Sequence, residues 1–135
     1  MEKSIRYYFL GISLIFVLTL SLEAKAQSEV INNIRAALKA GSSKEFVKNF
    51  NTMVELNFEG EKSNYSKSQS ELVLKVFFKK YPPTDFQYIH QGSSKQGLTY
   101  VIGKYTFESG SFRVWILIKK FGENYLVDSI DFSRE

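Results

Sequence analysis

The chain has 135 residues, of which 44% are hydrophobic and 24% are charged, and it contains no cysteine. The lack of cysteine excludes disulfides, thiol catalysis and zinc sites built on cysteine. Three of the 18 Lys and Arg residues and two of the 14 Asp and Glu residues lie in the first 26 positions, so the remainder carries a net charge of +3. Because this excess is small, we predict no nucleic-acid partner.

The first 26 residues have the three-part pattern of a secretory signal peptide. Lys3 and Arg6 form a basic start, residues 7–22 are mostly apolar, and Ala24-Lys25-Ala26 supplies a small-x-small cleavage pattern. The alternative is a retained anchor, but the apolar run is shorter than the roughly 20 residues that a spanning helix needs. We predict cleavage before Gln27, a periplasmic or extracellular location, and no stable membrane anchor after cleavage.

Residues 27–135 suit a single domain, and they begin with helical patterns. Apolar residues recur at helical spacing between positions 30 and 38, with Ser28 placed to cap the start and Gly41 to end the helix. Ser42 and Glu45 then have the spacing of a capping box, which predicts a short second helix.

The next segment predicts a short strand at 53–58, a polar loop at 60–66 and a third helix. Ser66 and Gln69 form a second capping box at the start of this helix, and Pro82-Pro83 ends it. The residues expected on its buried side are Leu72, Val73, Val76, Phe77 and Tyr81. Its lysines, Lys75, Lys79 and Lys80, are expected on a solvated face or in contact with anionic envelope components.

After the third helix, the hydrophobic period changes from helical to alternating. Four strands are predicted, at 86–91, 98–108, 111–121 and 125–132, separated by turns that contain glycine. The predicted fold class is therefore α+β, with N-terminal helices packed on a curved antiparallel sheet.

The alternation assigns the two faces of the second and third of these strands. A turn around Ser109-Gly110 is expected to pair Phe107 with Phe112 and to set Lys104 opposite Trp115. The expected core face holds Val101, Gly103, Tyr105, Phe107, Phe112, Val114, Ile116 and Ile118. The opposite face holds Lys104, Thr106, Glu108, Arg113, Trp115, Leu117 and Lys119.

The last hairpin allows two registers. A three-residue loop at 122–124 would pair Ile116 with Ile130, and a two-residue turn would instead bury Val127, Ser129 and Asp131. We favour the longer loop, because it turns a more apolar set inward: Leu126, Asp128, Ile130 and Phe132. An inward Asp128 would then need a partner, a water molecule or a raised pKa.

His90 is the chain's only histidine, and it alternates with Phe86 and Tyr88 on the face expected to point inward. A candidate ligand site therefore combines Tyr88, His90, Tyr105 and Asp128 on the concave side of the sheet. A His and carboxylate pair can perform general acid-base chemistry, so His90 and Asp128 are the catalytic candidates. The alternative is that both are structural, hydrogen-bonded or solvated residues. We predict no metal site and no cofactor.

The order of two helices, a short strand, a third helix and four antiparallel strands resembles the nuclear transport factor 2-like, or cystatin-like, α+β cone. Within that superfamily, residues 27–135 are similar to an exported bacterial family of unknown function. The segments that carry the resemblance are Tyr65-Ser66-Lys67-Ser68-Gln69, Phe77-Phe78, His90-Gln91-Gly92, Tyr100-Val101-Ile102-Gly103 and Phe112-Arg113-Val114. The superfamily includes isomerases and dehydratases that use Asp or His in the cone, and also domains that only bind or assemble. An analogous catalytic role would fall on His90 and Asp128.

Three functional hypotheses follow. The leading one is a non-catalytic exported module that binds an envelope protein or itself through a mixed sheet face. That interaction face comprises Ile102, Lys104, Arg113, Trp115 and Leu117. The second is a module that holds a small apolar ligand in the cone, unless aromatic side chains fill it. The third is an isomerase or dehydratase type of enzyme that uses His90 and Asp128.

Overall fold

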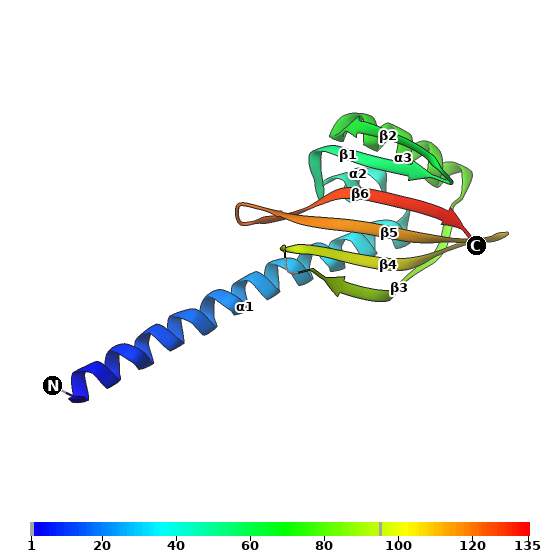
Figure 1. Cartoon of the computed structure of the whole chain (residues 1–135). Coiled ribbons are helices and arrows are strands. Elements are labelled where there is room, and N and C mark those ends of the chain that lie inside the picture. The colour runs from blue at the N-terminus through cyan, green and yellow to red at the C-terminus, as the bar shows by residue number, and fades with distance from the viewer. Residues whose placement is uncertain (1, 95) are drawn as a thin grey trace.

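The computed structural model of the chain describes residues 2–94 and 96–135 and shows helices on one side of a curved sheet (Figure 1). The helices are α1 (Glu2–Ala40), α2 (Ser43–Val47) and α3 (Lys67–Lys80). The strands are β1 (Phe50–Phe58), β2 (Glu61–Ser66), β3 (Pro83–Ser93), β4 (Leu98–Phe107), β5 (Gly110–Phe121) and β6 (Asn124–Arg134). The α+β fold class is confirmed.

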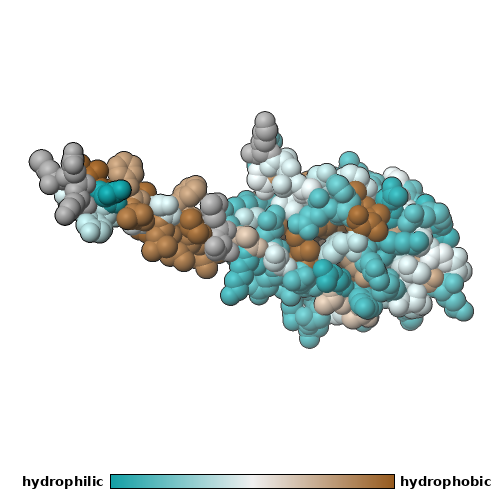
Figure 2. Space-filling view, turned by 90° about the horizontal axis from the view of Figure 1, so that it is seen from below, coloured by the Kyte–Doolittle hydropathy of each residue, from teal (hydrophilic) through white to brown (hydrophobic). Residues whose placement is uncertain are grey.

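Helix α1 runs without interruption from the apolar N-terminal segment into the domain (Figure 1). Its large apolar side chains between residues 5 and 18 are exposed, and Figure 2 shows them along the protruding part of the helix. Of the described helices, α1 alone is long and apolar enough to cross a membrane, so the expectation that its apolar run is too short to span is wrong. A signal sequence can have the same length and composition. The N-terminal segment is therefore compatible with a signal sequence.

The predicted helix start at Ser28 is wrong, because Ser28 lies inside α1. The residues on either side of the predicted cleavage position are mostly good helix formers, without glycine or proline, so nothing in the local sequence ends the helix there. The predicted end at Gly41 is confirmed: its φ of +66° belongs to the left-handed region that favours glycine. Ser42 caps α2 as predicted, since its hydroxyl accepts a hydrogen bond from the Glu45 backbone N–H.

The sheet has six strands in the order β2-β1-β6-β5-β4-β3. The sheet is mixed and not wholly antiparallel as predicted, because β1 runs parallel to β6 while the other neighbouring pairs are antiparallel. The predicted loop at 60–66 is instead strand β2, which a turn at Glu59-Gly60 joins to β1. The strand is polar because it lies at the edge of the sheet, where charged and polar side chains discourage pairing with another chain.

Helix α3 begins with the predicted capping box, formed by Ser66 and Gln69. Its buried face differs from the prediction, since Leu72 and Val76 are 66% and 69% exposed. The side chains that point inward are Ser70, Leu74, Phe77 and Phe78. Both sets have helical spacing, and the observed rotation buries the large Phe78 ring, which removes more apolar area from water than a valine would.

Aromatic side chains fill the space between the helices and the concave face of the sheet. Phe77 lies at the centre of this cluster, with ring centroids 4.5–5.9 Å from those of its aromatic neighbours. The largest fully buried side chains are Phe46, Phe50, Phe86, Tyr105, Phe112 and Phe132. The cone interior is therefore a packed core.

Candidate functional site

The β4–β5 hairpin has the predicted faces but a different register. Tyr105 pairs with Phe112, and Phe107 pairs with Gly110 across a two-residue turn, so the predicted pairing of Phe107 with Phe112 is wrong. A slip of two residues leaves every side chain on its predicted face, because side chains alternate with a period of two. The slip does change the neighbours across the strands. Lys104 lies opposite Arg113, and not opposite Trp115 as predicted.

A β-bulge at Asp128 combines the two registers considered for the last hairpin. The turn has two residues, so Phe121 pairs with Asn124 and Ile118 pairs with Val127. The register shifts at the bulge, after which Ile116 pairs with Ile130 as predicted.

Because of the bulge, the inward-facing residues of β6 differ from those predicted. Val127 is buried, as are the predicted core residues Ile130 and Phe132, whereas Leu126 and Asp128 are only partly buried. Asp128 Oδ2 lies 2.9 Å from Lys119 Nζ, and the Asp128 side chain is 27% exposed. Its carboxylate is therefore ion-paired at the surface of the sheet and is not turned into the core.

A second β-bulge, at Ile89, carries His90 away from the interior. Tyr88 pairs with Gly103 and His90 pairs with Ile102, so Ile89 has no partner in the register. His90 is exposed, and its Nε2 lies 3.3 Å from the Tyr100 hydroxyl. The predicted meeting of His90, Asp128 and Tyr105 on the concave face is therefore wrong.

Tyr88 and Tyr105 remain on the core side of the sheet, where each hydroxyl donates to a backbone carbonyl. Tyr88 bonds to the Ile31 oxygen at 2.6 Å, and Tyr105 bonds to the Tyr81 oxygen. Burial raises the pKa of both phenols, and for Tyr88 the Arg35 guanidinium opposes part of that rise. Both hydroxyls are therefore neutral donors that tie α1 and the end of α3 to the sheet.

The outer face of the sheet carries an aromatic pair beside a groove. Trp115 is 45% exposed, and its ring stacks on Tyr100 with centroids 5.4 Å apart. Gly92 makes room for this pair, since a Cβ atom there would lie 2.3 Å from the Tyr100 ring. The groove has a volume of about 340 Å³, and it is lined by Glu55, Asn57, Tyr100, Trp115, Leu117, Ser129, Ile130 and Asp131. Below we call it the outer groove.

The polar wall of the outer groove is ordered. Asp131 lies directly opposite Trp115 in the sheet, and it accepts hydrogen bonds from Asn57 Nδ2 at 2.7 Å and from the Ser133 hydroxyl at 2.8 Å. Glu55 Oε1 lies 3.6 Å from Lys62 Nζ.

The predicted interaction face is found on the outer side of the sheet. Lys104, Arg113 and Leu117 share the outer face with Trp115, as predicted, whereas Ile102, which pairs with Trp115, is largely buried. The contribution of β1 was missed, because its parallel pairing with β6 leaves no local signal in the sequence.

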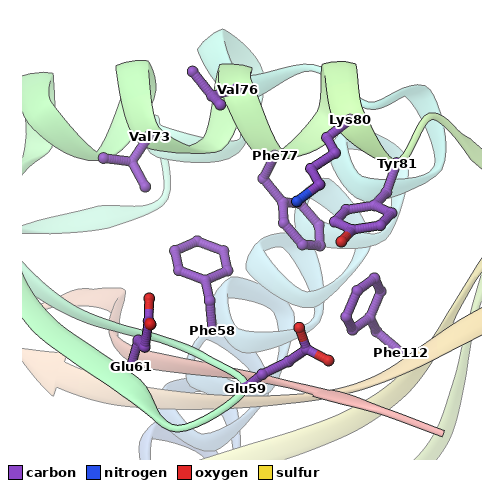
Figure 3. Close-up of a pocket in the computed structure, with 9 residues that line it drawn as sticks. All are labelled: Phe58, Glu59, Glu61, Val73, Val76, Phe77, Lys80, Tyr81 and Phe112. Atoms are coloured by element: carbon purple, nitrogen blue, oxygen red, sulfur yellow. The ribbon is translucent and has the colours of Figure 1, made fainter.

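A second hollow, which we call the mouth cleft, lies between α3 and the β1–β2 hairpin (Figure 3). Its volume is about 540 Å³, and its lining is Phe58, Glu59, Glu61, Val73, Val76, Phe77, Lys80, Tyr81 and Phe112. Arg134 closes one side, with Nε 3.2 Å from Glu59 Oε1 and a guanidinium N–H donating to the Tyr81 hydroxyl at 2.8 Å. Within residues 2–94 and 96–135, no group of three or more His, Asp or Glu side chains is arranged to hold a metal ion.

Similar solved structures define the fold class. A domain of unknown function with a cystatin-like fold from Nostoc punctiforme matches with a TM-score of 0.65 at 10% identity, covering 84% of this chain and 77% of that chain. An NTF-2 like protein of unknown function from Silicibacter pomeroyi matches with a TM-score of 0.61 at 10% identity, covering 86% and 98%. The protein therefore has the predicted nuclear transport factor 2-like, cystatin-like α+β fold.

The chain belongs to the DUF4783 family, a domain of unknown function, whose sequence profile matches residues 31–133. A crystal structure of a DUF4783 family protein from Bacteroides ovatus is 31% identical, with a TM-score of 0.73, and the match covers 76% of this chain and 93% of that chain. No curated protein matches the chain. The predicted resemblance to a family of unknown function is confirmed, and the family by itself defines no activity.

Proposed function

We propose that this protein is an exported, non-catalytic binding module that holds a cationic side chain of a partner protein in the outer groove. Export is supported by the apolar N-terminal segment, which is compatible with a signal sequence. The family and the fold leave the activity open, so the proposal depends on the geometry of the site.

The contents of the cone support binding rather than catalysis. Aromatic rings occupy the concave side, and the hydroxyls of Tyr88 and Tyr105 are committed to backbone carbonyls. His90 and Asp128 lie outside the cone, and each has a local partner, Tyr100 and Lys119 respectively. These contacts are those of structural side chains, and His90 and Asp128 do not face a shared cavity as an acid-base pair would.

The observation that carries the proposal is an exposed tryptophan directly opposite a carboxylate. Trp115 and Asp131 are neighbours across β5 and β6, a relation that sets Cβ atoms about 5 Å apart. A cation between them contacts the face of the indole ring and the carboxylate at once, and tryptophan is the ring that attracts cations most strongly. The groove lining includes no Lys or Arg and two carboxylates, of which Glu55 is paired with Lys62 outside the lining and Asp131 is held only by neutral donors. A cation from a partner therefore fits the charge of this site.

The test uses Trp115 as the reporter, because it is the only tryptophan in the chain. The probes are two short blocked Gly-Ser peptides, one with a central arginine and one with citrulline in its place. We expect the arginine peptide to change the Trp115 fluorescence saturably. We expect Asp131→Asn to weaken that binding about fivefold, the scale of one partly screened ion pair. Glu123→Gln is the matched control, since it removes an exposed carboxylate at the hairpin tip, and it should leave the affinity unchanged.

Two results would contradict this proposal. Equal affinity for the citrulline and arginine peptides would show that the groove does not recognise positive charge. A concentration-dependent dimer in analytical ultracentrifugation that Trp115→Asp abolishes would show that the occupant is a second copy of the chain.

A further inference from the structure

The exposed apolar side chains of α3 continue into the mouth cleft. Val76 is 69% exposed and lines the cleft, and Leu72, one turn earlier on the helix, is 66% exposed. Because the core uses Leu74, Phe77 and Phe78, this second apolar stripe has no partner among the described residues. Figure 3 shows Val73 and Phe77 pointing from α3 toward Phe58 and Phe112. Phe77 reaches across the cleft, with its ring centroid 5.2 Å from those of Phe58 and Phe112. These three rings therefore form an apolar floor, and Val73 and Val76 add apolar lining from α3.

The charges around the mouth cleft differ from one end to the other. Glu59 is neutralised by Arg134, which also occupies the Tyr81 hydroxyl. Lys80 lies over the Tyr81 ring, with Nζ 5.3 Å from its centroid, and has no carboxylate at ion-pair distance in the described part of the chain. Glu61 lies at the other end, below Val73 (Figure 3). An anionic group is therefore attracted to the Lys80 end and repelled from the Glu61 end.

We infer that the mouth cleft binds a free single-chain amphiphile with a carboxylate head, such as a fatty acid. The apolar chain would lie against Phe58, Val73 and Val76, and the carboxylate would meet Lys80. The cleft volume of about 540 Å³ lies within the range of small-ligand sites. A bilayer surface is the poorer fit, because Phe58, Val73 and Phe77 face a hollow and do not project outward, although Val76 at its edge is exposed. This inference is independent of the outer groove.

The experiment is isothermal titration calorimetry of the purified protein with dodecanoate below its micelle concentration. We expect saturable binding of dodecanoate, weaker binding of dodecanol, and the weakest binding of dodecyltrimethylammonium. Val76→Asp should reduce the affinity for dodecanoate at least about tenfold, because it sets a carboxylate on the apolar wall. Val76 is exposed, so this substitution removes no core contact, and circular dichroism should show an unchanged fold.

The two lysine variants separate the head from the tail of the ligand. Lys80→Gln should weaken dodecanoate about threefold and leave dodecanol unchanged, since only the ion pair is lost. Lys75→Gln is the matched control, because Lys75 lies on the same helix and does not line the cleft, and it should change neither affinity.

Three outcomes would overturn the inference. One is the absence of saturable dodecanoate binding, and another is binding of dodecyltrimethylammonium as tight as that of dodecanoate. The third concerns vesicles of anionic phosphatidylglycerol. If the protein cosediments with them through a Val76-dependent contact and binds no dodecanoate, the apolar stripe serves a bilayer and not a free ligand.

Discussion

At the scale of single residues, two buried tyrosines make the domain less stable at alkaline pH. Burial raises the folded-state pKa of Tyr88 and Tyr105 above the ordinary value of about 10. As the pH rises past about 10, the unfolded chain loses these protons first, so the free energy of unfolding falls from there upward. Below about pH 10 both states hold the protons, and this contribution is fully present.

In urea unfolding, we expect the contribution of the two tyrosines to the free energy of unfolding to stay constant up to about pH 10 and to decline above it. Tyr88→Phe should lower the free energy of unfolding at pH 7 by about 1 kcal/mol, because the bond to the Ile31 carbonyl is lost. The double variant Tyr88→Phe, Tyr105→Phe should decline less steeply above about pH 10. An equally steep decline in the double variant would show that other groups cause the alkaline loss.

At the scale of secondary-structure elements, two of the register shifts in the sheet, the β-bulges at Ile89 and Asp128, show where the alternating pattern stops predicting the faces. The alternating pattern predicted the faces of β4 and β5 correctly, because those strands keep the two-residue period throughout. It failed at Ile89 and Asp128, because each bulge adds one unpaired residue and inverts the faces beyond it. In β6 the sequence does carry a trace of the bulge: the buried Val127 and Ile130 are three residues apart, which no regular strand allows on one face.

The bulge at Asp128 gives a prediction that separates the observed register from the predicted one. Val127 is fully buried, so Val127→Ala should lower the free energy of unfolding by about 2 kcal/mol. Asp128→Ala removes only the surface pair with Lys119, and it should cost less than about 1 kcal/mol. Urea denaturation of the two variants at neutral pH is the measurement. The reverse order of costs would show that Asp128, and not Val127, faces the core.

The buried face of helix α3 could not be predicted from the sequence, for a different reason. Two overlapping stripes satisfy helical spacing, one through Leu72 and Val76 and the other through Leu74 and Phe78. Periodicity alone could not choose between them, and the choice depends on the aromatic cluster beneath, where Phe78 meets Phe46 and Tyr105. Of the stripe that does not face the core, Val76 lines the mouth cleft and Leu72 is exposed one turn before it. The exposed apolar stripe of α3 is therefore the surface that a ligand could cover.

At the scale of the whole molecule, the two candidate sites lie on different surfaces of one packed core. The outer groove is built from β1, β4, β5 and β6, and the mouth cleft lies between α3 and the β1–β2 hairpin. Because the core separates the concave side from the outer face, we expect variants of Val76 to leave arginine-peptide binding unchanged. The element order was sufficient to predict the fold, whereas the outer groove required the parallel pairing of β1 with β6.

The last prediction concerns where the folded domain begins. In α1 the first core side chains are Ile31 and Ile34, and the Ile31 carbonyl accepts the Tyr88 hydrogen bond. Before them, Glu23 contacts Lys120 and Gln27 contacts Thr99. Removal of residues 1–26 should therefore lose the exposed Glu23 pair, keep the contact of Gln27 and leave a chain that unfolds cooperatively in urea.

A longer truncation provides the contrast. Removal of residues 1–34 also deletes Ile31 and Ile34, both buried, and should cost at least about 4 kcal/mol, enough to unfold much of a marginally stable domain. Circular dichroism and urea titration of the two truncated chains measure this difference. If removal of residues 1–26 is as damaging as removal of 1–34, the apolar segment is an integral part of the fold. A cleaved signal peptide could not have that role, because the mature protein must stay folded after the segment is gone.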